Sequence, residues 1–125
     1  MTISRRQARR QALFLLYQWD LSGQQIGSQY AGEIDPWARG VAEAVAARAD
    51  ELDARITSAS EGWTADRLGT VERSALRVAV HELQTGEVPV EVAINEAVAF
   101  AKRYASEDAA RLVNGILGRI QREAA

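Results

Sequence analysis

Four arginines stand close together near the start of the chain, and no acidic residue lies among them. All 17 acidic residues of this 125-residue sequence come after residue 19, and the formal net charge is −2. On an α-helix with 3.6 residues per turn, the four guanidinium groups fall within an arc of about 140°. Guanidinium groups bind carboxylate and phosphate oxygens through paired hydrogen bonds. We therefore predict an anion-binding site formed by Arg5, Arg6, Arg9 and Arg10.

The same helix also carries an aromatic ring. Leu13 and Tyr17 follow Arg10 at helical spacing, so the tyrosine shares a side of the helix with the arginines. Single-stranded RNA is bound by cations that contact phosphates and by rings on which unstacked bases lie. Cations at a helix N-terminus oppose the helix dipole, so helix stability does not account for the cluster. We predict RNA binding here; the alternatives are a solvated or ion-paired role for any single arginine, and a core-edge position for Tyr17.

No constellation of residues indicates catalysis. The segment that begins with His81 and Glu82 starts like the HExxH zinc motif, but Thr85 stands where the second histidine is required. The chain has one histidine and no cysteine, which excludes thiolate chemistry and cysteine-based zinc sites. Glycine-rich phosphate loops and the serine nucleophile motif are also missing from the sequence. We predict that the protein is not an enzyme, that it holds no metal or cofactor, and that His81 packs at the margin of a helix.

Apolar residues recur at helical spacing along most of the chain, and no alternating strand pattern persists. The sequence therefore predicts one all-α domain, which we expect to be cytoplasmic because no apolar run approaches the ~20 residues of a membrane span. A helix over residues 70–85 is apolar around most of its circumference, so we expect it to be central and the most buried. The expected helices are residues 4–22 beginning at Ser4, residues 36–59 capped by Asp35, a short turn at 63–68, residues 70–85 capped by Thr70, one starting at Pro89, and one capped by Ser106.

Four polar or small residues interrupt the apolar pattern of the last two expected helices. Asn95 and Asn114 lie on largely apolar segments, where a buried and hydrogen-bonded amide can fix the register of a helix. We expect that role for both asparagines. Gly115 and Gly118 each cost about 1 kcal/mol relative to alanine inside a helix, which indicates a close approach between helices.

Three segments together resemble the NusB family. The first is the arginine-rich stretch RRQARRQALFLLYQW, from Arg5 to Trp19, and the second is LGTVERSALRVAVHEL, from Leu68 to Leu83. The third and most specific is VPVEVAINEAV, which begins at Val88 and is followed by Ala-Lys at 101–102 and by VNGIL at 113–117. The resemblance covers essentially the whole chain, in the order and spacing of the family.

The resemblance implies an all-α fold of two packed helical subdomains, at about 1–60 and 61–125. It also implies a role in transcription antitermination of ribosomal RNA operons, with other antitermination factors and RNA polymerase as indirect partners. Proteins of this family bind the boxA element of single-stranded nascent RNA together with the ribosomal protein NusE. The positions that match the family's RNA site are Arg5, Arg6, Arg9, Tyr17, Asp108 and Leu112, and those that match its NusE surface are Asp66 and Glu72.

Two positions depart from the family pattern, and two other functions stay open. Leu112 stands where the family often has phenylalanine, so a base cannot stack there on a ring, and His81 replaces a usual tyrosine. One alternative is a helical protein–protein adaptor or a homodimer, with only nonspecific RNA affinity. Dependence of binding on the boxA sequence and on Tyr17 separates this alternative from antitermination. Another alternative is an accessory module of an RNA cytosine methyltransferase, against which the lack of cysteine argues.

Overall fold

The structure, a computed structural model, describes residues 3–124. Within this range there are six α-helices, one short 3₁₀ helix and no β-strand, which confirms the predicted all-α class. None of these helices combines the length and the apolar character needed to cross a bilayer. The elements are α1 (Arg5–Ser22), α2 (Pro36–Ala47), α3 (Ala49–Ser58), η1 (Ala65–Arg67), α4 (Thr70–Thr85), α5 (Val90–Tyr104) and α6 (Glu107–Ala124).

Local capping signals fix the starts of three helices and the end of α1. Ser4 and Gln7 form a reciprocal capping box before α1, and Gly23 ends that helix in the left-handed conformation, at φ 71°. Asp35 caps α2 by accepting a hydrogen bond of 3.1 Å from a backbone N–H three residues on. Ser106 does the same for α6, at 3.0 Å. The predicted starts of these three helices are therefore confirmed.

Three boundaries differ from the prediction. The helix expected over residues 36–59 is divided at Arg48, whose φ of −106° and ψ of 13° lie outside the helical range, and α3 turns away from α2. The N-cap of α4 is Gly69 and not Thr70, which is already helical. The carboxylate of Glu72 lies 2.8 Å from the point where a Cβ at position 69 would stand, so only glycine fits there without a shift. Pro89 is the N-cap of α5, and the helix itself begins at Val90.

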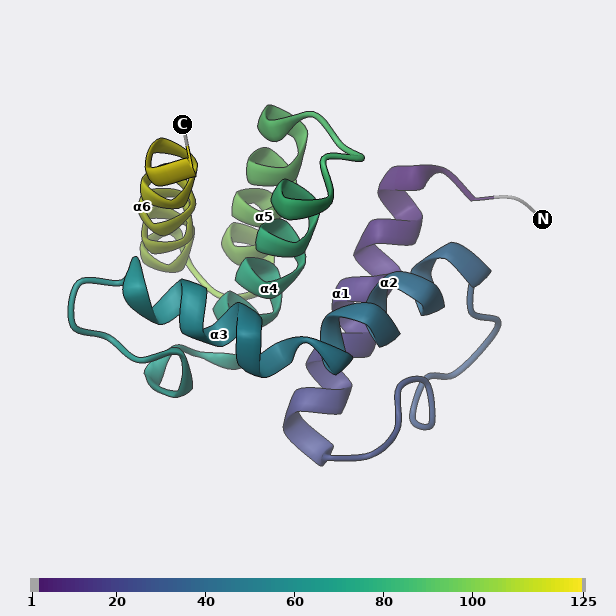
Figure 1. Ribbon diagram of the computed structural model, residues 1–125. Coiled ribbons are helices and arrows are strands. Elements are labelled where there is room, and N and C mark those ends of the chain that lie inside the picture. The colour runs from purple at the N-terminus through teal and green to yellow at the C-terminus, as the bar shows by residue number, and fades with distance from the viewer. Residues whose placement is uncertain (1–2, 125) are drawn as a thin grey trace.

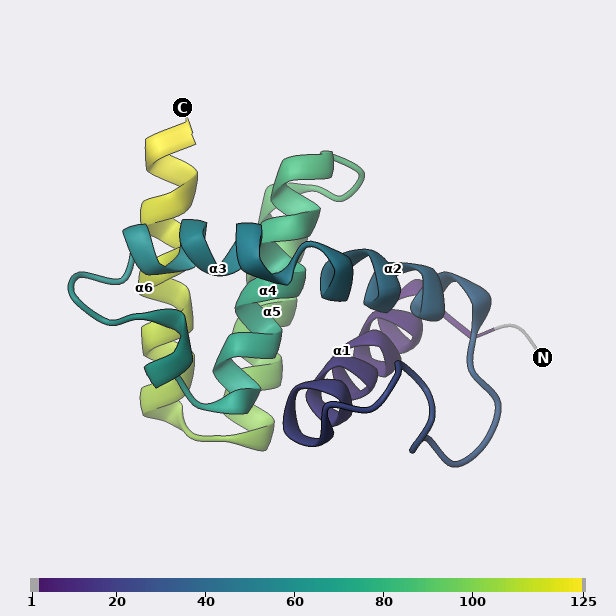
Figure 2. The ribbon, with the colours of Figure 1, turned by 60° about the horizontal axis from the view of Figure 1, so that its bottom comes forward.

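Helix α4 is the centre of the molecule, as its apolar circumference predicted. It contacts α1, α2, α3, α5 and α6, and residues 74–80 are all buried. Helices α1 and α2 pack together on one side of α4 and α6 lies on the other, while α5 runs along α4 and α6 and α3 packs across α4 (Figures 1 and 2). Buried apolar residues from all six α-helices join in one core cluster. The division into subdomains near residue 60 stays a prediction, and the packing of α3 on α4 runs across it.

Ion pairs reinforce the core on two sides of α4. Arg77 makes two hydrogen bonds to Asp53 of α3, at 2.8 and 2.7 Å, and its Nη1 lies 3.4 Å from Asp20 of α1. Arg73, one turn earlier, lies 2.7 Å from the same Asp20. Burial disfavours the charged guanidinium of Arg77, but the hydrogen bonds and charges of the two aspartates outweigh it, so its pKa is raised. These pairs connect α4 to both α1 and α3.

The roles predicted for the polar and small residues of the last two helices are wrong. Asn95 and Asn114 are both exposed, and the core face of α6 is formed by Val113, Ile116 and Leu117 among others and not by Asn114. A Cβ at Gly115 would meet no atom within 4 Å, and one at Gly118 would meet only the guanidinium of Arg122, at 3.2 Å. No helix approaches these glycines closely. They line an open groove of about 380 Å³ together with the two asparagines.

His81 helps to hold α4 against the start of α3. The Nη1 atom of Arg48 donates a hydrogen bond of 2.9 Å to His81 Nδ1, and its Nη2 donates to Gln84. Burial lowers the pKa of His81, the positive charge of Arg48 lowers it further, and Glu87 opposes both effects. The ring is thus a neutral acceptor for the arginine, which fits the predicted place at a packing margin. Within residues 3–124 no three His, Cys, Asp or Glu side chains are grouped so as to hold a metal ion.

Stability is expected to fall on acidification because of His81. In the unfolded chain the ring takes up a proton near pH 6.5, whereas the folded protein resists protonation until lower pH. The contribution of His81 is therefore fully present above about pH 6.5 and is lost as the pH falls below that value. Thermal unfolding of the wild type and of His81→Gln, followed by circular dichroism between about pH 5 and pH 8, measures the effect. The variant keeps an acceptor for Arg48 but does not titrate, so its Tm should fall less; parallel curves would contradict the assignment.

Candidate nucleic-acid interface

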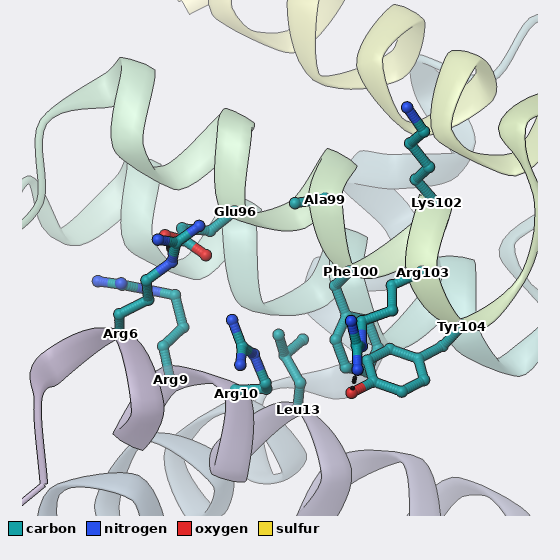
Figure 3. A pocket seen from close by; sticks show the side chains of 10 residues that line it. All are labelled: Arg6, Arg9, Arg10, Leu13, Glu96, Ala99, Phe100, Lys102, Arg103 and Tyr104. Carbon is teal, nitrogen blue, oxygen red and sulfur yellow. Dashed lines mark hydrogen bonds and ion pairs between the residues drawn. The ribbon is translucent and has the colours of Figure 1, made fainter.

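Helices α1 and α5 lie side by side and run in the same direction, with a groove between them. Arg6 pairs with Glu96 at 2.9 Å, and two turns later the ring of Phe14 lies 5.5 Å from that of Phe100 and 4.9 Å from that of Tyr104. The groove has a volume of about 300 Å³ (Figure 3). We call it the α1–α5 groove; it is lined by Arg6, Arg9, Arg10, Leu13, Glu96, Ala99, Phe100, Lys102, Arg103 and Tyr104.

Cations from both helices border this groove. Arg10 is exposed, its guanidinium points into the space between α1 and α5 (Figure 3), and within residues 3–124 no carboxylate pairs with it. Arg103 of α5 donates a hydrogen bond of 3.1 Å to the hydroxyl of Tyr104. Lys102 is exposed at the edge of the groove, where its side chain points toward α6 (Figure 3), and it lies 3.8 Å from Glu107, a distance at which a solvated ion pair is weak. The groove therefore presents several cations that an anionic ligand can reach.

An aromatic cluster closes the end of the groove that lies next to α6. The rings of Phe14, Phe100 and Tyr104 are in contact, with centroids 4.9 to 5.5 Å apart. Phe100 is buried, but Tyr104 is 38% exposed, so part of its ring faces solvent. A flat ring held by two neighbours beside a guanidinium is the arrangement on which an unpaired base stacks.

Arg9 does not point into solvent with the other three arginines. It is 4% exposed and pairs with the equally buried Glu82 of α4, with Nε and Nη2 each 2.9 Å from the carboxylate. Burial raises the pKa of Glu82, and the charge of Arg9 opposes the rise. Ala12, Leu13 and Leu16 follow Arg9 at i+3, i+4 and i+7 and are all buried, so this arginine shares the core face of α1. Arg9 is positioned to hold α1 on α4. Of the roles considered for a single arginine, the ion-paired one therefore applies to Arg9.

The first two arginines of the cluster remain accessible. The guanidinium carbon of Arg5 lies 4.2 Å from the centre of the Trp37 ring of α2, in a cation–π contact, and that of Arg9 lies 5.8 Å from the same ring. The Arg6 side chain is 66% exposed although it pairs with Glu96. The predicted cluster therefore contains three exposed arginines, Arg5, Arg6 and Arg10, around a buried fourth.

Four residues of the predicted RNA site do not line the α1–α5 groove. One is Arg5, which lines a neighbouring groove. Tyr17 is partly buried on α1, one turn beyond Leu13, as the core-edge alternative has it. Asp108 is exposed in the first turn of α6 and pairs with Arg111. Leu112, one turn further along α6, is 37% exposed and faces a different groove. The structure thus places Asp108 and Leu112 beyond the turn that follows α5.

The two acids predicted to face NusE lie near each other in the chain, around the start of α4. Asp66 is exposed in η1, and a hydrogen bond from the side chain of Thr64 lowers its pKa, so it is charged at neutral pH. Glu72 is half-buried in the first turn of α4, against Gly69, where the helix dipole favours an acid. Neither lines the α1–α5 groove, so these acids and the exposed arginines occupy separate surfaces.

Sequence reasoning missed the contribution of α5. Lys102, Arg103 and Tyr104 stand in succession at the end of that helix, just before the Ser106 cap. Residues 97–106 contain no acid, as in the arginine-rich start of the chain. Two adjacent cations, an aromatic residue and the lack of acids were the available signal.

The two kinds of arginine on α1 should separate in a stability measurement. Arg9→Gln leaves the carboxylate of Glu82 buried without its partner, which is expected to cost about 3 kcal/mol of unfolding free energy. Arg10→Gln, at an exposed site, should change it by less than about 0.5 kcal/mol. Urea unfolding of both variants checks this difference.

Acidification provides a second readout for the Arg9 variant. Protonation makes Glu82 neutral and removes its need for a cation, so the deficit of Arg9→Gln should shrink as the pH falls. Equal stabilities of the two variants, or a deficit independent of pH, would show that Arg9 does not have the structural role assigned to it.

Comparison with known proteins places this architecture in a family. The NusB family model matches residues 6–122. The transcription antitermination protein NusB of Salinispora tropica is 41% identical, over 94% of this chain and 94% of its own length. The solved structure of NusB from T. maritima matches with a TM-score of 0.85 and 30% identity, over 98% of this chain and 94% of that one. A structure of the antitermination factors NusB and NusE in complex with double-stranded RNA matches with a TM-score of 0.83 and 30% identity, over 95% and 96% of the two chains. Full-length similarity in both sequence and fold shows that the chain belongs to the NusB family.

Proposed function

We propose that this transcription antitermination factor of the NusB family binds single-stranded boxA-type RNA along the α1–α5 groove, together with NusE. The observation that carries the proposal is the meeting of exposed arginines from α1 with Arg103 and Tyr104 from α5 in one groove. The membership of this chain in the NusB family also confirms the prediction that the protein is not an enzyme. Binding, and not turnover, is the chemistry that these residues supply.

The character of the groove favours unpaired RNA over a duplex. Phosphates can lie against the guanidinium groups of Arg6 and Arg10, which are exposed and are not enclosed by the core. A base can stack on the exposed part of Tyr104 only if it is not already paired and stacked in a helix. A solved relative is in complex with double-stranded RNA, so the experiment below includes both forms of RNA.

NusE is the second partner in the proposal. A NusB and NusE have been solved together in one complex with double-stranded RNA. In this chain Asp66 and Glu72 lie outside the α1–α5 groove, so a protein bound there leaves the groove open to RNA. An exposed carboxylate such as that of Asp66 suits a basic ribosomal protein and contributes to the rate and specificity of association.

Loss of the groove's cations or of its ring should weaken RNA binding by different routes. Arg10→Gln removes one phosphate contact and should reduce the slope of log affinity against log salt by about 0.7. Tyr104→Leu should cost about 1–3 kcal/mol of binding free energy with little change in slope, whereas Tyr104→Phe keeps the stacking surface. Fluorescence anisotropy with labelled boxA RNA, scrambled RNA and a boxA duplex, each at several salt concentrations, measures these effects. Arg67→Gln is the matched control, since Arg67 is exposed on η1 and does not line the groove.

The outcome also decides between antitermination-type recognition and the adaptor reading. Preference of the wild type for boxA, strengthened by NusE, supports the proposal. Equal affinity for boxA and scrambled RNA, unmoved by NusE, would favour a protein–protein adaptor with nonspecific charge. Sedimentation of the same samples then reports whether a homodimer forms.

Reversal of charge at the α3–α4 connection should affect NusE and not RNA. Asp66→Lys places a cation opposite a basic partner, so the affinity for NusE should fall at least several-fold while binding of boxA RNA alone is unchanged. Asp50→Lys, at an exposed site in the first turn of α3, is the control for the change in net charge. Calorimetric titration with purified NusE measures the difference; equal losses in the two variants would remove Asp66 from the interface.

A further inference from the structure

A second groove lies on the far side of α6, away from α1. It is formed between α6 and the segment that connects α3 to η1, which run beside each other in Figures 1 and 2. Its volume is about 350 Å³. We call it the Trp63 groove; the residues that give it its character are Trp63, Arg111, Leu112, Gly115, Arg119 and Arg122.

Two apolar side chains in this groove face solvent. Trp63 is 53% exposed and Leu112 is 37% exposed, and both belong to the small set of large apolar residues that are exposed within residues 3–124. Gly115 also lines this groove and leaves open space where a side chain would otherwise stand. An exposed indole beside a helix position that has no side chain leaves room for another flat ring to stack on the indole.

The charge of the groove is positive although the whole chain is slightly acidic. Three arginines line it, and Glu61 is the one carboxylate among the described residues that do. Arg119 pairs with Glu61 at 3.2 Å and with Glu123 at 3.1 Å, and the side chains of Arg119 and Glu61 are 37% and 81% exposed. Arg111 pairs with the exposed Asp108 in the same way. Solvated pairs of this kind contribute little and open easily, so the guanidinium groups of Arg111 and Arg119 are available to another anion. A basic protein would meet like charge here, whereas a polyanion with flat rings matches both features.

The Trp63 groove begins one turn into α6, past the end of α5 that closes the first groove. Tyr104 closes the α1–α5 groove at the last residue of α5, and α6 begins three residues later. Asp108 lies in the first turn of α6, and Leu112, one turn further, is already part of the Trp63 groove. A strand that leaves the first groove past Tyr104 therefore reaches the second after passing one short turn.

We infer that the Trp63 groove is a second RNA subsite, in which a base stacks on the indole of Trp63 and phosphates lie against the arginines of α6. The inference rests on the proposed function and extends it, because it assigns a longer RNA footprint than the α1–α5 groove alone provides. It also gives Leu112 a role without a ring of its own, since Leu112 packs beside a base that Trp63 holds.

RNA length is the variable that tests the inference. A boxA RNA of minimal length and the same RNA extended by several nucleotides at either end are titrated against the wild type, Trp63→Leu and Trp63→Phe. Trp63→Leu should bind one extended RNA roughly tenfold more weakly than the wild type does, the effect of one lost stacking contact. It should bind the minimal RNA equally well, and Trp63→Phe should keep most of the affinity. Leu21→Ala, which changes another exposed apolar residue outside both grooves, is the matched control.

The outcomes separate failure of this inference from failure of the proposed function. If the wild type binds the minimal RNA but gains nothing from either extension, or if Trp63→Leu loses nothing, the second subsite is overturned and the first groove stands. If the wild type binds none of the RNAs, the proposed function and the inference fall together. If Trp63→Leu loses affinity for NusE alone, the groove belongs to a protein partner and the inference is overturned. Arg122→Gln supplies an independent reading, since it should lower the salt slope for the extended RNA only.

Discussion

The position of α1 on α4 depends on charges that are buried between them. Arg9 of α1 meets Glu82 near the end of α4, and Asp20 of α1 meets Arg77 nearer its middle. Asp53 of α3 shares the same Arg77, so three helices are held by one guanidinium. Removing one member of such a set leaves a charge in the core without a partner, which is far more costly than the net gain from the intact pair. The groove between α1 and α5 exists because α4 carries both neighbours at fixed positions.

The same residue type serves two purposes within one turn of α1. Arg9 lies on the core face and is used for folding, whereas Arg6 and Arg10 project past it toward α5 and remain exposed. Their chemistry is identical, and only the side of the helix differs. The sequence contained this information, because Ala12 and Leu16 mark the core face on which Arg9 falls. Counting all four arginines as one cluster concealed it.

Features set by local chemistry were predictable, and features set by contacts between distant segments were not. The caps at Ser4, Asp35 and Ser106 follow from side chains that bond to the adjacent backbone, and all three are found in the structure. The break at Arg48 is different, since that side chain reaches α4, more than 30 residues away. The contribution of residues 102–104 to the candidate site likewise depends on α5 lying beside α1. The resemblance to the family supplied NusE and boxA, which no pattern of charge or periodicity indicates.

The contact between Arg5 and Trp37 affects the entropy of binding. A free arginine side chain loses about 1.5–2 kcal/mol of rotamer freedom when it is fixed. With its guanidinium 4.2 Å above the indole, Arg5 has given up much of that freedom when the protein folds, before any ligand arrives. Arg10 has no such support and must be ordered by the ligand itself. If the proposed RNA site extends to Arg5, a phosphate there is therefore fixed at a smaller entropic cost than one at Arg10.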